Sequence, residues 1–180
     1  MLEVYALNVK MPLKQKVNQL FLEQVSKERV ARIARFKRVE DGRRTLMGEI
    51  LIKAMLSKHL NKPVKEIAFL NNAFGKPYLP NDPFYFNVSH SGNWVVGAIS
   101  TVPIGIDIEK IKQSDLGIAR RFFTYNEYQA ICHRSDETLR NQSFYLYWSG
   151  KESYIKMIGK GLTIPLDAFE LDFSKEKLVL

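Results

Sequence analysis

The chain has 180 residues, of which 46% are hydrophobic and 26% charged, a composition that predicts a soluble globular protein of one domain or two small lobes. Its single cysteine, Cys132, excludes an internal disulfide and a thiolate zinc cluster. No apolar run reaches the length of a membrane span, and residues 1–10 lack the layout of a signal peptide, so we expect a cytoplasmic protein.

The net charge of +8 is concentrated in the first third of the chain. Residues 1–62 hold 14 Lys and Arg against 6 Asp and Glu, whereas residues 63–180 hold 13 of each kind. A local excess of this size indicates an anionic partner for that region: a polyphosphate ligand, a nucleic acid or an acidic protein.

The first elements in chain order are a strand and two helices. Alternation over residues 3–9 predicts the strand, and helical spacing predicts a helix over 12–25. A short helix over 27–38 would place Arg29, Arg32 and Arg35 on one side, with Val30, Ile33 and Ala34 facing inward. Such an arginine row is either a solvated basic face or a binding site for an anion that relieves the repulsion; Lys37, Arg38, Arg43 and Arg44 follow at once and favour phosphate binding.

A long helix is predicted over residues 41–60, with Thr45 near its start, where a hydroxyl and unpaired backbone N–H groups could meet a phosphate. Strands are predicted over 66–70, 84–88 and 94–100, and a turn over 73–77 from its Gly and Pro. Residues 89–93 are expected to form a polar loop between the last two strands. The loop holds Ser89 and His90, whose donors suit an oxyanion, but no companion acid for a serine hydrolase.

Two carboxylates stand on the segment 103–109, which is predicted to be a strand because three isoleucines alternate with Gly105, Asp107 and Glu109. Residues two apart on a strand lie roughly 6.6 Å apart on one face. Adjacent carboxylates raise each other's pKa unless a cation sits between them, and Mg²⁺ prefers such oxygens. The pattern therefore leaves two alternatives, a metal site or a solvated edge with Lys110 as counter-charge.

The remaining chain is predicted to be mostly helical. Helices are expected over 114–123, after a capping box at 124–127, and over 138–158, where Trp148, Glu152 and Lys156 share one side. Gly150 costs that helix about 1 kcal/mol relative to alanine, and Gly159 ends it. Strands are predicted over 168–173 and 177–180.

Three motifs occur in order: NVSHSG at 87–92, GIDIE at 105–109 and WSGKESYIK at 148–156. The chain thereby resembles the Sfp-type 4′-phosphopantetheinyl transferases, which carry a G-[IV]-D-[IV]-E strand and a W-x-x-K-E-[AS]-x-x-K helix. The resemblance runs from about residue 5 to the C-terminus and includes shorter matches at 44–48, 74–77 and 121–123. Each motif alone would be weak, but their order is specific.

The resemblance implies roles for individual residues. Asp107, Glu109 and Glu152 would hold Mg²⁺ together with the diphosphate of coenzyme A. The other expected ligand contacts are to the adenine and phosphates of coenzyme A or to the transferred group, and they would come from Arg29, Arg32, Thr45, Phe74, Gly75, Lys76, Pro77, Ser89, His90, Lys151 and Lys156. Glu152, Lys156 and His90 are the residues expected to act in catalysis, with Glu152 as the base, directly or through a metal-bound water, and Lys156 stabilising the leaving phosphate.

The implied reaction moves 4′-phosphopantetheine from coenzyme A to a serine of an acidic carrier protein and releases 3′,5′-ADP, as in nonribosomal peptide and antibiotic synthesis. We weigh it against another metal-dependent phosphodiester-cleaving enzyme and against a basic nucleic-acid-binding module. The last would need aromatic residues among the basic ones, and only Phe36 is there. We therefore expect no nucleic-acid partner, no membrane, and a monomer.

The implied fold is α+β, with two similar lobes, residues 1–101 and 102–180, each a small antiparallel sheet packed with a long helix around the ligands. Two departures from the family stand out. Gly150 replaces a larger residue, and the chain ends before several strands that family members have. The second lobe is therefore expected to be shortened, with an uncovered sheet edge that is destabilising.

Overall fold

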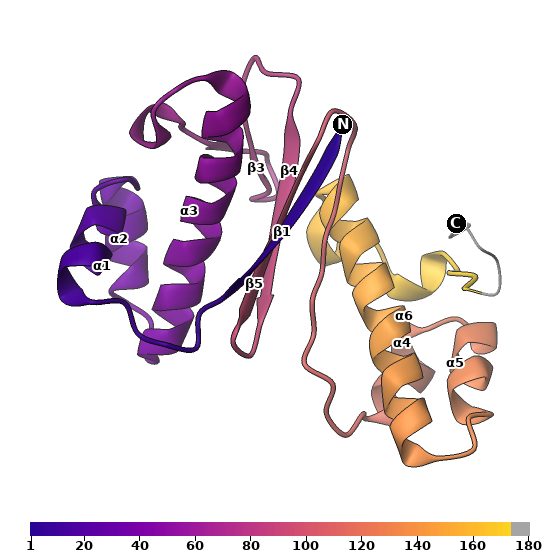
Figure 1. Cartoon of the computed structure of the whole chain (residues 1–180). Helices are drawn as coiled ribbons and strands as arrows, with labels where there is room; N and C mark the ends of the chain where they lie inside the picture. The colour runs from indigo at the N-terminus through magenta and orange to yellow at the C-terminus, as the bar shows by residue number, and fades with distance from the viewer. Residues whose placement is uncertain (174–180) are drawn as a thin grey trace.

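The structure is a computed structural model and describes residues 1–173 (Figure 1). Two antiparallel sheets are formed by strands β1 (Leu2–Asn8), β2 (Leu70–Asn71), β3 (Pro77–Tyr78), β4 (Tyr85–Ser91) and β5 (Trp94–Ser100). The helices are α1 (Gln15–Leu22), α2 (Lys27–Ile33), α3 (Val39–Leu60), α4 (Leu116–Phe122), α5 (Tyr125–Cys132) and α6 (Glu137–Ile158), and short 3₁₀ turns are η1 (Val64–Glu66), η2 (Gly161–Thr163) and η3 (Leu166–Ala168).

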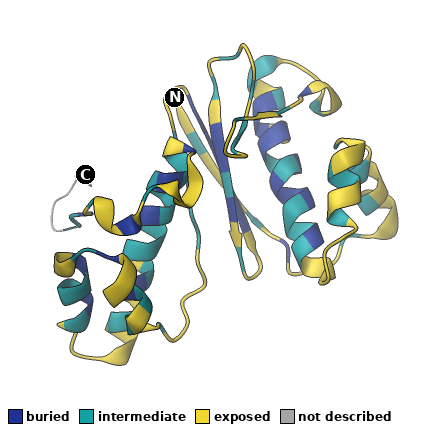
Figure 2. Cartoon of the chain, turned by 180° about the vertical axis from the view of Figure 1, so that it is seen from behind, coloured by how far each residue is buried: buried dark blue, intermediate teal, exposed yellow. Residues whose placement is uncertain are grey.

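A three-stranded sheet of order β1-β5-β4 stands at the centre of the molecule, with α3 on one side and α6 on the other (Figure 1). The α3 face forms a core in which Ile52 and Leu56 pack with Phe86 and Ile99. Figure 2 shows the buried residues along α3 and the central strands. Since both α3 and the sheet are apolar on the facing sides, this contact removes apolar surface from water.

The second half of the described chain is helical. Ala119, Phe123, Ile131 and Phe144 form its core, where α4, α5 and α6 meet. The predicted capping box starts α5: the side chain of Thr124 accepts from the Glu127 N–H, and the Glu127 side chain accepts from the Thr124 N–H. The long helix predicted after it is confirmed as α6, and Gly159 caps its end at φ +73°.

The α+β class is confirmed, as are the first strand, the helices of the first third and the turn at 73–77. Three details were wrong. The predicted strand over 66–70 is mostly irregular: Glu66 ends η1, residues 67–69 belong to no helix or strand, and only Leu70 begins the two-residue β2. Strand β4 runs through Ser91, so the expected loop is only a two-residue hairpin turn. Ala34 is exposed, not inward-facing, because α2 ends at Ile33.

The segment 103–109 was wrongly predicted to be a strand. It is extended but joins no sheet, and its isoleucines are only partly buried. The sheet expected in the second half is likewise not formed between residues 102 and 173, where only Asp172 makes an isolated bridge, in place of the strand predicted over 168–173. The strand predicted over 177–180 lies outside the described residues.

Packing explains why a glycine stands at position 150 in α6, although glycine has a low helix propensity. A Cβ at this position would lie 2.7 Å from Leu171 Cδ1 and 3.1 Å from Phe173 Cζ. The glycine therefore lets the chain after η3 lie directly on α6, and this contact offsets part of its cost in the helix.

Among residues 1–173, no helix combines the length and apolarity needed to cross a membrane.

Candidate functional site

A row of polar side chains on β4 holds the segment that carries the two carboxylates. Asn87, Ser89 and Ser91 alternate along the strand and so share the face opposite α3. Asn87 Oδ1 accepts from the Ile106 N–H at 2.9 Å, and Ser91 Oγ accepts from the Lys110 N–H at 3.0 Å. These side chains replace the backbone ladder that a true neighbouring strand would make.

Gly105 places the same segment directly against α6. A Cβ on Gly105 would overlap the carbonyl oxygen of Ser153 and lie 2.6 Å from the backbone nitrogen of Met157. Only glycine permits so close an approach of two backbones. The segment is therefore fixed between β4 and α6, with Asp107 two residues further on.

Asp107 forms the centre of the candidate site. Lys156 Nζ lies 2.5 Å from Asp107 Oδ1, and both groups share a third partner, since Ser89 Oγ donates to Asp107 at 2.7 Å and accepts from Lys156 at 2.9 Å. The Asp107 side chain is only 3% exposed, and its second oxygen, Oδ2, is buried with no hydrogen-bond partner within the described chain. The site thus holds one unsatisfied anionic acceptor, a costly arrangement unless a ligand or ion meets it.

Glu152 lies one helical turn before Lys156 and is electrostatically coupled to the same cluster. Partial burial raises its pKa above the ordinary value, Asp107 and Glu109 raise it further, and Lys156 opposes them. Glu109 is held by the Ser91 hydroxyl, which donates at 2.9 Å. Carboxylates from the 103–109 segment and from α6 therefore bring negative charge to the same place.

The three acids expected to bind metal do not form a closed ligand set. No group of three Asp, Glu, His or Cys side chains within residues 1–173 is arranged to hold a metal ion. The ammonium of Lys156 supplies positive charge to Asp107 instead. The donors nevertheless suit Mg²⁺ chemically, because a buried carboxylate oxygen without a partner and a carboxyl with a raised pKa are both relieved by a hard cation.

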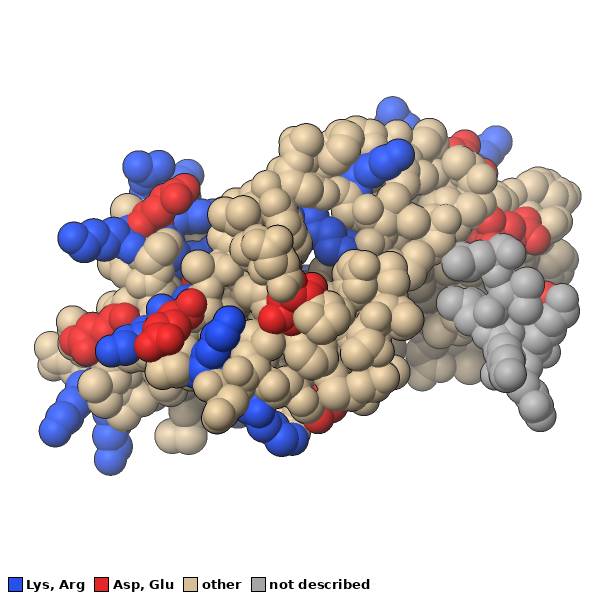
Figure 3. Space-filling model, turned by 90° about the horizontal axis from the view of Figure 1, so that it is seen from above, with Lys and Arg blue, Asp and Glu red and all other residues tan. Residues whose placement is uncertain are grey.

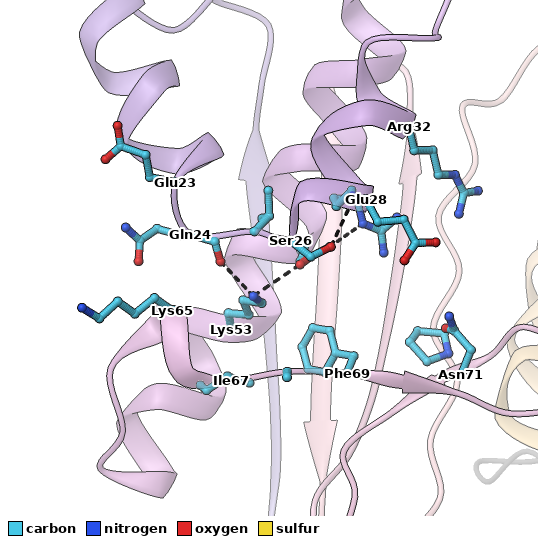
Figure 4. A pocket seen from close by; sticks show the side chains of 15 residues that line it. Glu23, Gln24, Ser26, Glu28, Arg32, Lys53, Lys65, Ile67, Phe69 and Asn71 are labelled. Atoms are coloured by element: carbon cyan, nitrogen blue, oxygen red, sulfur yellow. Dashed lines mark hydrogen bonds and ion pairs between the residues drawn. The ribbon is translucent and has the colours of Figure 1, made fainter.

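The basic residues of α2 border a separate pocket of about 270 Å³ between α2, α3 and the β2–β3 hairpin (Figure 4). Arg29 and Arg32 both line it, but Arg29 Nε is already paired with Glu49 at 2.5 Å. Glu49 thus already supplies part of the negative charge that an anionic ligand was expected to bring to the arginine row. Lys and Arg side chains are concentrated over the end of the molecule built by α1 to α3 (Figure 3).

His90 and Thr45 lie apart from the carboxylates. His90 is exposed on β4, on the opposite face from Ser89, since neighbouring strand residues alternate. Partial burial lowers its pKa, as do Arg44 and Lys156, while its own backbone and Asp41 oppose this. Thr45 is half-buried in the second turn of α3.

The turn at 73–77 reaches from the first half of the chain to the end of α6. Gly75 has φ +84°, a conformation that favours glycine, and Phe74 is 54% exposed. Lys76 Nζ donates to the Met157 carbonyl at 2.8 Å, and burial lowers the pKa of Lys76. Pro77 lines the pocket beside Arg32.

Lys151, a predicted ligand contact, lies inside the helical core. Its side chain is fully buried, pairs with Glu127 at 2.8 Å, and donates to the carbonyls of Leu166 and Phe169 at 2.7 and 2.6 Å. All three ammonium donors are used inside the helical core. Lys151 therefore holds η3 on α5 and α6 and does not line the Asp107 cluster; adjacent helical residues point in different directions.

Asn72 was not recognised from the sequence. Its side chain shapes the turn at 73–77 and also bonds to Gly159, at the end of α6. An asparagine shortly before a glycine turn is a local signal for the first role, but nothing in the sequence marks the second.

Two family models divide the chain between them. Residues 11–102 match the 4′-phosphopantetheinyl transferase N-terminal family, and residues 103–178 match the 4′-phosphopantetheinyl transferase superfamily. Among curated relatives, the 4′-phosphopantetheinyl transferase Sfp of Bacillus subtilis is 40% identical over 171 residues, covering 94% of this chain and 76% of the relative. The transferase gsp of Aneurinibacillus migulanus is 40% identical over 180 residues, covering 100% and 75%.

More distant relatives match as well. The mouse L-aminoadipate-semialdehyde dehydrogenase-phosphopantetheinyl transferase is 33% identical over 169 residues, covering 86% of this chain and 55% of the relative. With matches of this extent on both halves, the chain belongs to the 4′-phosphopantetheinyl transferase superfamily.

Proposed function

We propose that the protein transfers the 4′-phosphopantetheine group of coenzyme A to a serine hydroxyl of an apo carrier protein, with Mg²⁺, and releases 3′,5′-ADP. The observation that carries the proposal is the cluster of Ser89, Asp107 and Lys156 beside Glu152. It combines an unpaired carboxylate oxygen, a base and a cation at one place.

Asp107, Glu109 and Glu152 would hold the magnesium ion together with the diphosphate. When bound, the ion would supply positive charge that offsets the charge on the diphosphate oxygens. Lys156 would then exchange part of its contact with Asp107 for a phosphate oxygen of the leaving nucleotide, since a flexible ammonium can serve both.

Glu152 is the proposed base for the attacking serine. In the metal-free chain, burial and the neighbouring acids raise the pKa of this carboxyl, a shift that a bound magnesium ion would oppose. The role rests on position: Glu152 lies one turn of α6 before Lys156, which pairs with Asp107. The serine oxygen forms a bond to the β-phosphorus, the bond to the adenosine-side phosphate breaks, and the serine proton passes to Glu152.

The ligand's nucleotide end would lie toward α2 and the 73–77 turn. Arg32 is exposed at the pocket, and Arg29 is present there with its partner Glu49. Phe74, Gly75, Lys76 and Pro77 would border the adenine, and Thr45, Ser89 and His90 would donate to phosphates. Lys151 is left out of the ligand site, since its donors are occupied.

We also propose two lobes, residues 1–101 and 102–180, with the ligands between them. The two family matches meet at residues 102 and 103, and the Asp107 segment lies between β4 and α6. The free thiol of Cys132 fits a reducing, cytoplasmic setting, and a chain that contains both lobes fits a monomer.

The test is to incubate the protein with coenzyme A, Mg²⁺ and an apo carrier protein, and to weigh the carrier. A gain of one phosphopantetheine is expected. Asp107→Ala and Glu152→Ala should abolish the gain while remaining folded, and Asp82→Ala, which removes only a local bond to the Phe84 N–H, is the matched control. A carrier of unchanged mass, with nucleic acid cut or bound, would instead favour the alternative classes.

A further inference from the structure

The turn that follows β2 is joined to the end of α6 by two hydrogen bonds. Asn72 Nδ2 donates to the Gly159 carbonyl at 2.8 Å, and Lys76 Nζ donates to the Met157 carbonyl at 2.8 Å. The last carbonyls of a helix have no partner within it and carry partial negative charge. The turn therefore caps α6 from a part of the sequence more than eighty residues away.

The other side of the same amide builds the turn. Asn72 Oδ1 accepts from the N–H groups of Phe74 and Lys76, each at 2.9 Å, and the Asn72 N–H donates to the Lys76 carbonyl at 2.9 Å. Two N–H donors facing one end of the amide require oxygen there, which leaves the amide nitrogen toward Gly159. One planar group is thus fixed at both ends.

The end of α6 that this turn caps also carries a predicted catalytic residue. Lys156 lies three residues before Gly159, and its ammonium meets both Ser89 and Asp107. Glu152 lies one turn earlier on the same helix. The space is closely filled as well, because a Cβ on Gly159 would overlap the Lys76 side chain.

We propose that Asn72 is a positioning residue for the transfer reaction, joining the turn that borders the nucleotide to the helix that bears Glu152 and Lys156. This inference rests on the proposed function. Its amide oxygen shapes the binding turn, and its amide nitrogen sets the axial position of α6. The two ends can therefore be separated by experiment.

Asn72→Asp separates them with almost no change of shape. The carboxylate keeps an acceptor for the Phe74 and Lys76 N–H groups, but it replaces the donor to the Gly159 carbonyl with a second acceptor. Asn8→Asp is the matched control, because Asn8 Oδ1 makes only a local bond, to the Lys10 N–H at 3.0 Å. The same chemical change is thus made once at the junction with α6 and once far from it.

For Asn72→Asp we expect coenzyme A affinity, measured by calorimetry, to stay within about threefold, since the loss of an interaction worth less than about 0.7 kcal/mol changes an equilibrium constant no more than that. We expect kcat to fall by on the order of tenfold to a hundredfold, because small displacements of reacting groups are costly. Amide hydrogen exchange in the last turn of α6 should be faster. Asn8→Asp should leave all three unchanged.

The inference is overturned if Asn72→Asp keeps the wild-type kcat, or if its last α6 turn exchanges at the wild-type rate. The exchange measurement needs no activity, so a wild-type protein that transfers nothing refutes the proposed function and still leaves the junction tested. Lys76→Met is the second variant, in case Asn72→Asp does not fold. It removes the ammonium at Met157 and keeps the backbone bonds of the turn, and faster exchange at the end of α6 is again expected.

Discussion

Gly105→Ala adds one methyl group at the closest backbone contact of the candidate site. The new Cβ would overlap the Ser153 carbonyl oxygen and lie 2.6 Å from the Met157 nitrogen, both of them backbone atoms of α6. Neither atom can rotate away as a side chain would. The segment that carries Asp107 must therefore move away from α6.

The loss of stability depends on whether the new methyl group meets backbone or a flexible side chain. Forcing an extra methyl group into a filled site costs about 1–3 kcal/mol, and the upper end applies here because the obstacle is helical backbone. For a chain of this size, 3 kcal/mol lowers the melting temperature by about 6–12 °C. Displacement also lengthens the 2.5 Å contact between Lys156 and Asp107, so transfer should fall by about a hundredfold.

The assay is thermal unfolding together with the carrier-mass measurement, using Gly161→Ala as control. A Cβ on Gly161 meets nothing within 4 Å, and only its φ of +60° opposes a side chain, which costs about 1–2 kcal/mol. By the same conversion that variant should melt about 2–8 °C lower, but it should keep its activity. A Gly105→Ala protein that melts and transfers like the wild type would show that the segment is not held against α6 as described.

Three further predictions concern charges. In metal-free buffer, the raised pKa of Glu152 means that the folded chain binds this proton more tightly than the unfolded one, so its contribution to stability falls as pH rises from the ordinary to the raised pKa. The melting temperature of Glu152→Gln should therefore rise relative to that of the wild type as pH increases over that range. A difference in melting temperature that does not change with pH would contradict the burial argument. Lys151→Met leaves the 1% exposed Glu127 carboxylate without its cation and should cost about 3–5 kcal/mol in denaturant unfolding; adding Glu127→Gln should restore part, and no recovery would show that the unpaired charge is not the cause. Arg32→Ala should raise the KM for coenzyme A about fivefold, the equivalent of about 1 kcal/mol for an exposed ionic contact, whereas Arg35→Ala, beyond the end of α2, should not; equal effects would mean that only net charge matters.

Periodicity predicted the helices well because each has a continuous apolar face or a strong local signal. The capping box at Thr124 and the glycine at 159 mark helix ends by chemistry that involves only neighbouring residues. The segment 103–109 alternates like a strand for a different reason. On one side it contacts three side chains of β4, and on the other the backbone of α6. The alternating residues therefore face two different neighbours, and the segment forms no ladder of backbone hydrogen bonds with another strand.

The candidate site shows the same division. The motif residues Ser89, Asp107 and Lys156 do meet, as expected if they belong to one site. Lys151 lies between motif residues in the sequence, yet it points into the helical core to pair with Glu127, a partner that no local pattern indicates. Asn72 was missed because its contact with Gly159 spans the two halves of the chain.

Residue type and short spacing were enough to predict the basic first third, the helices and the motifs that mark the family. Which cations are paired inside the molecule, and which glycines are required for close contact, became clear from the folded structure. Those properties depend on atoms brought together from distant parts of the chain: Arg29 by Glu49, Lys151 by Glu127, and Gly105 by the backbone of α6. Burial and pairing set whether a charged group can meet a ligand, and neither is a local property of the sequence.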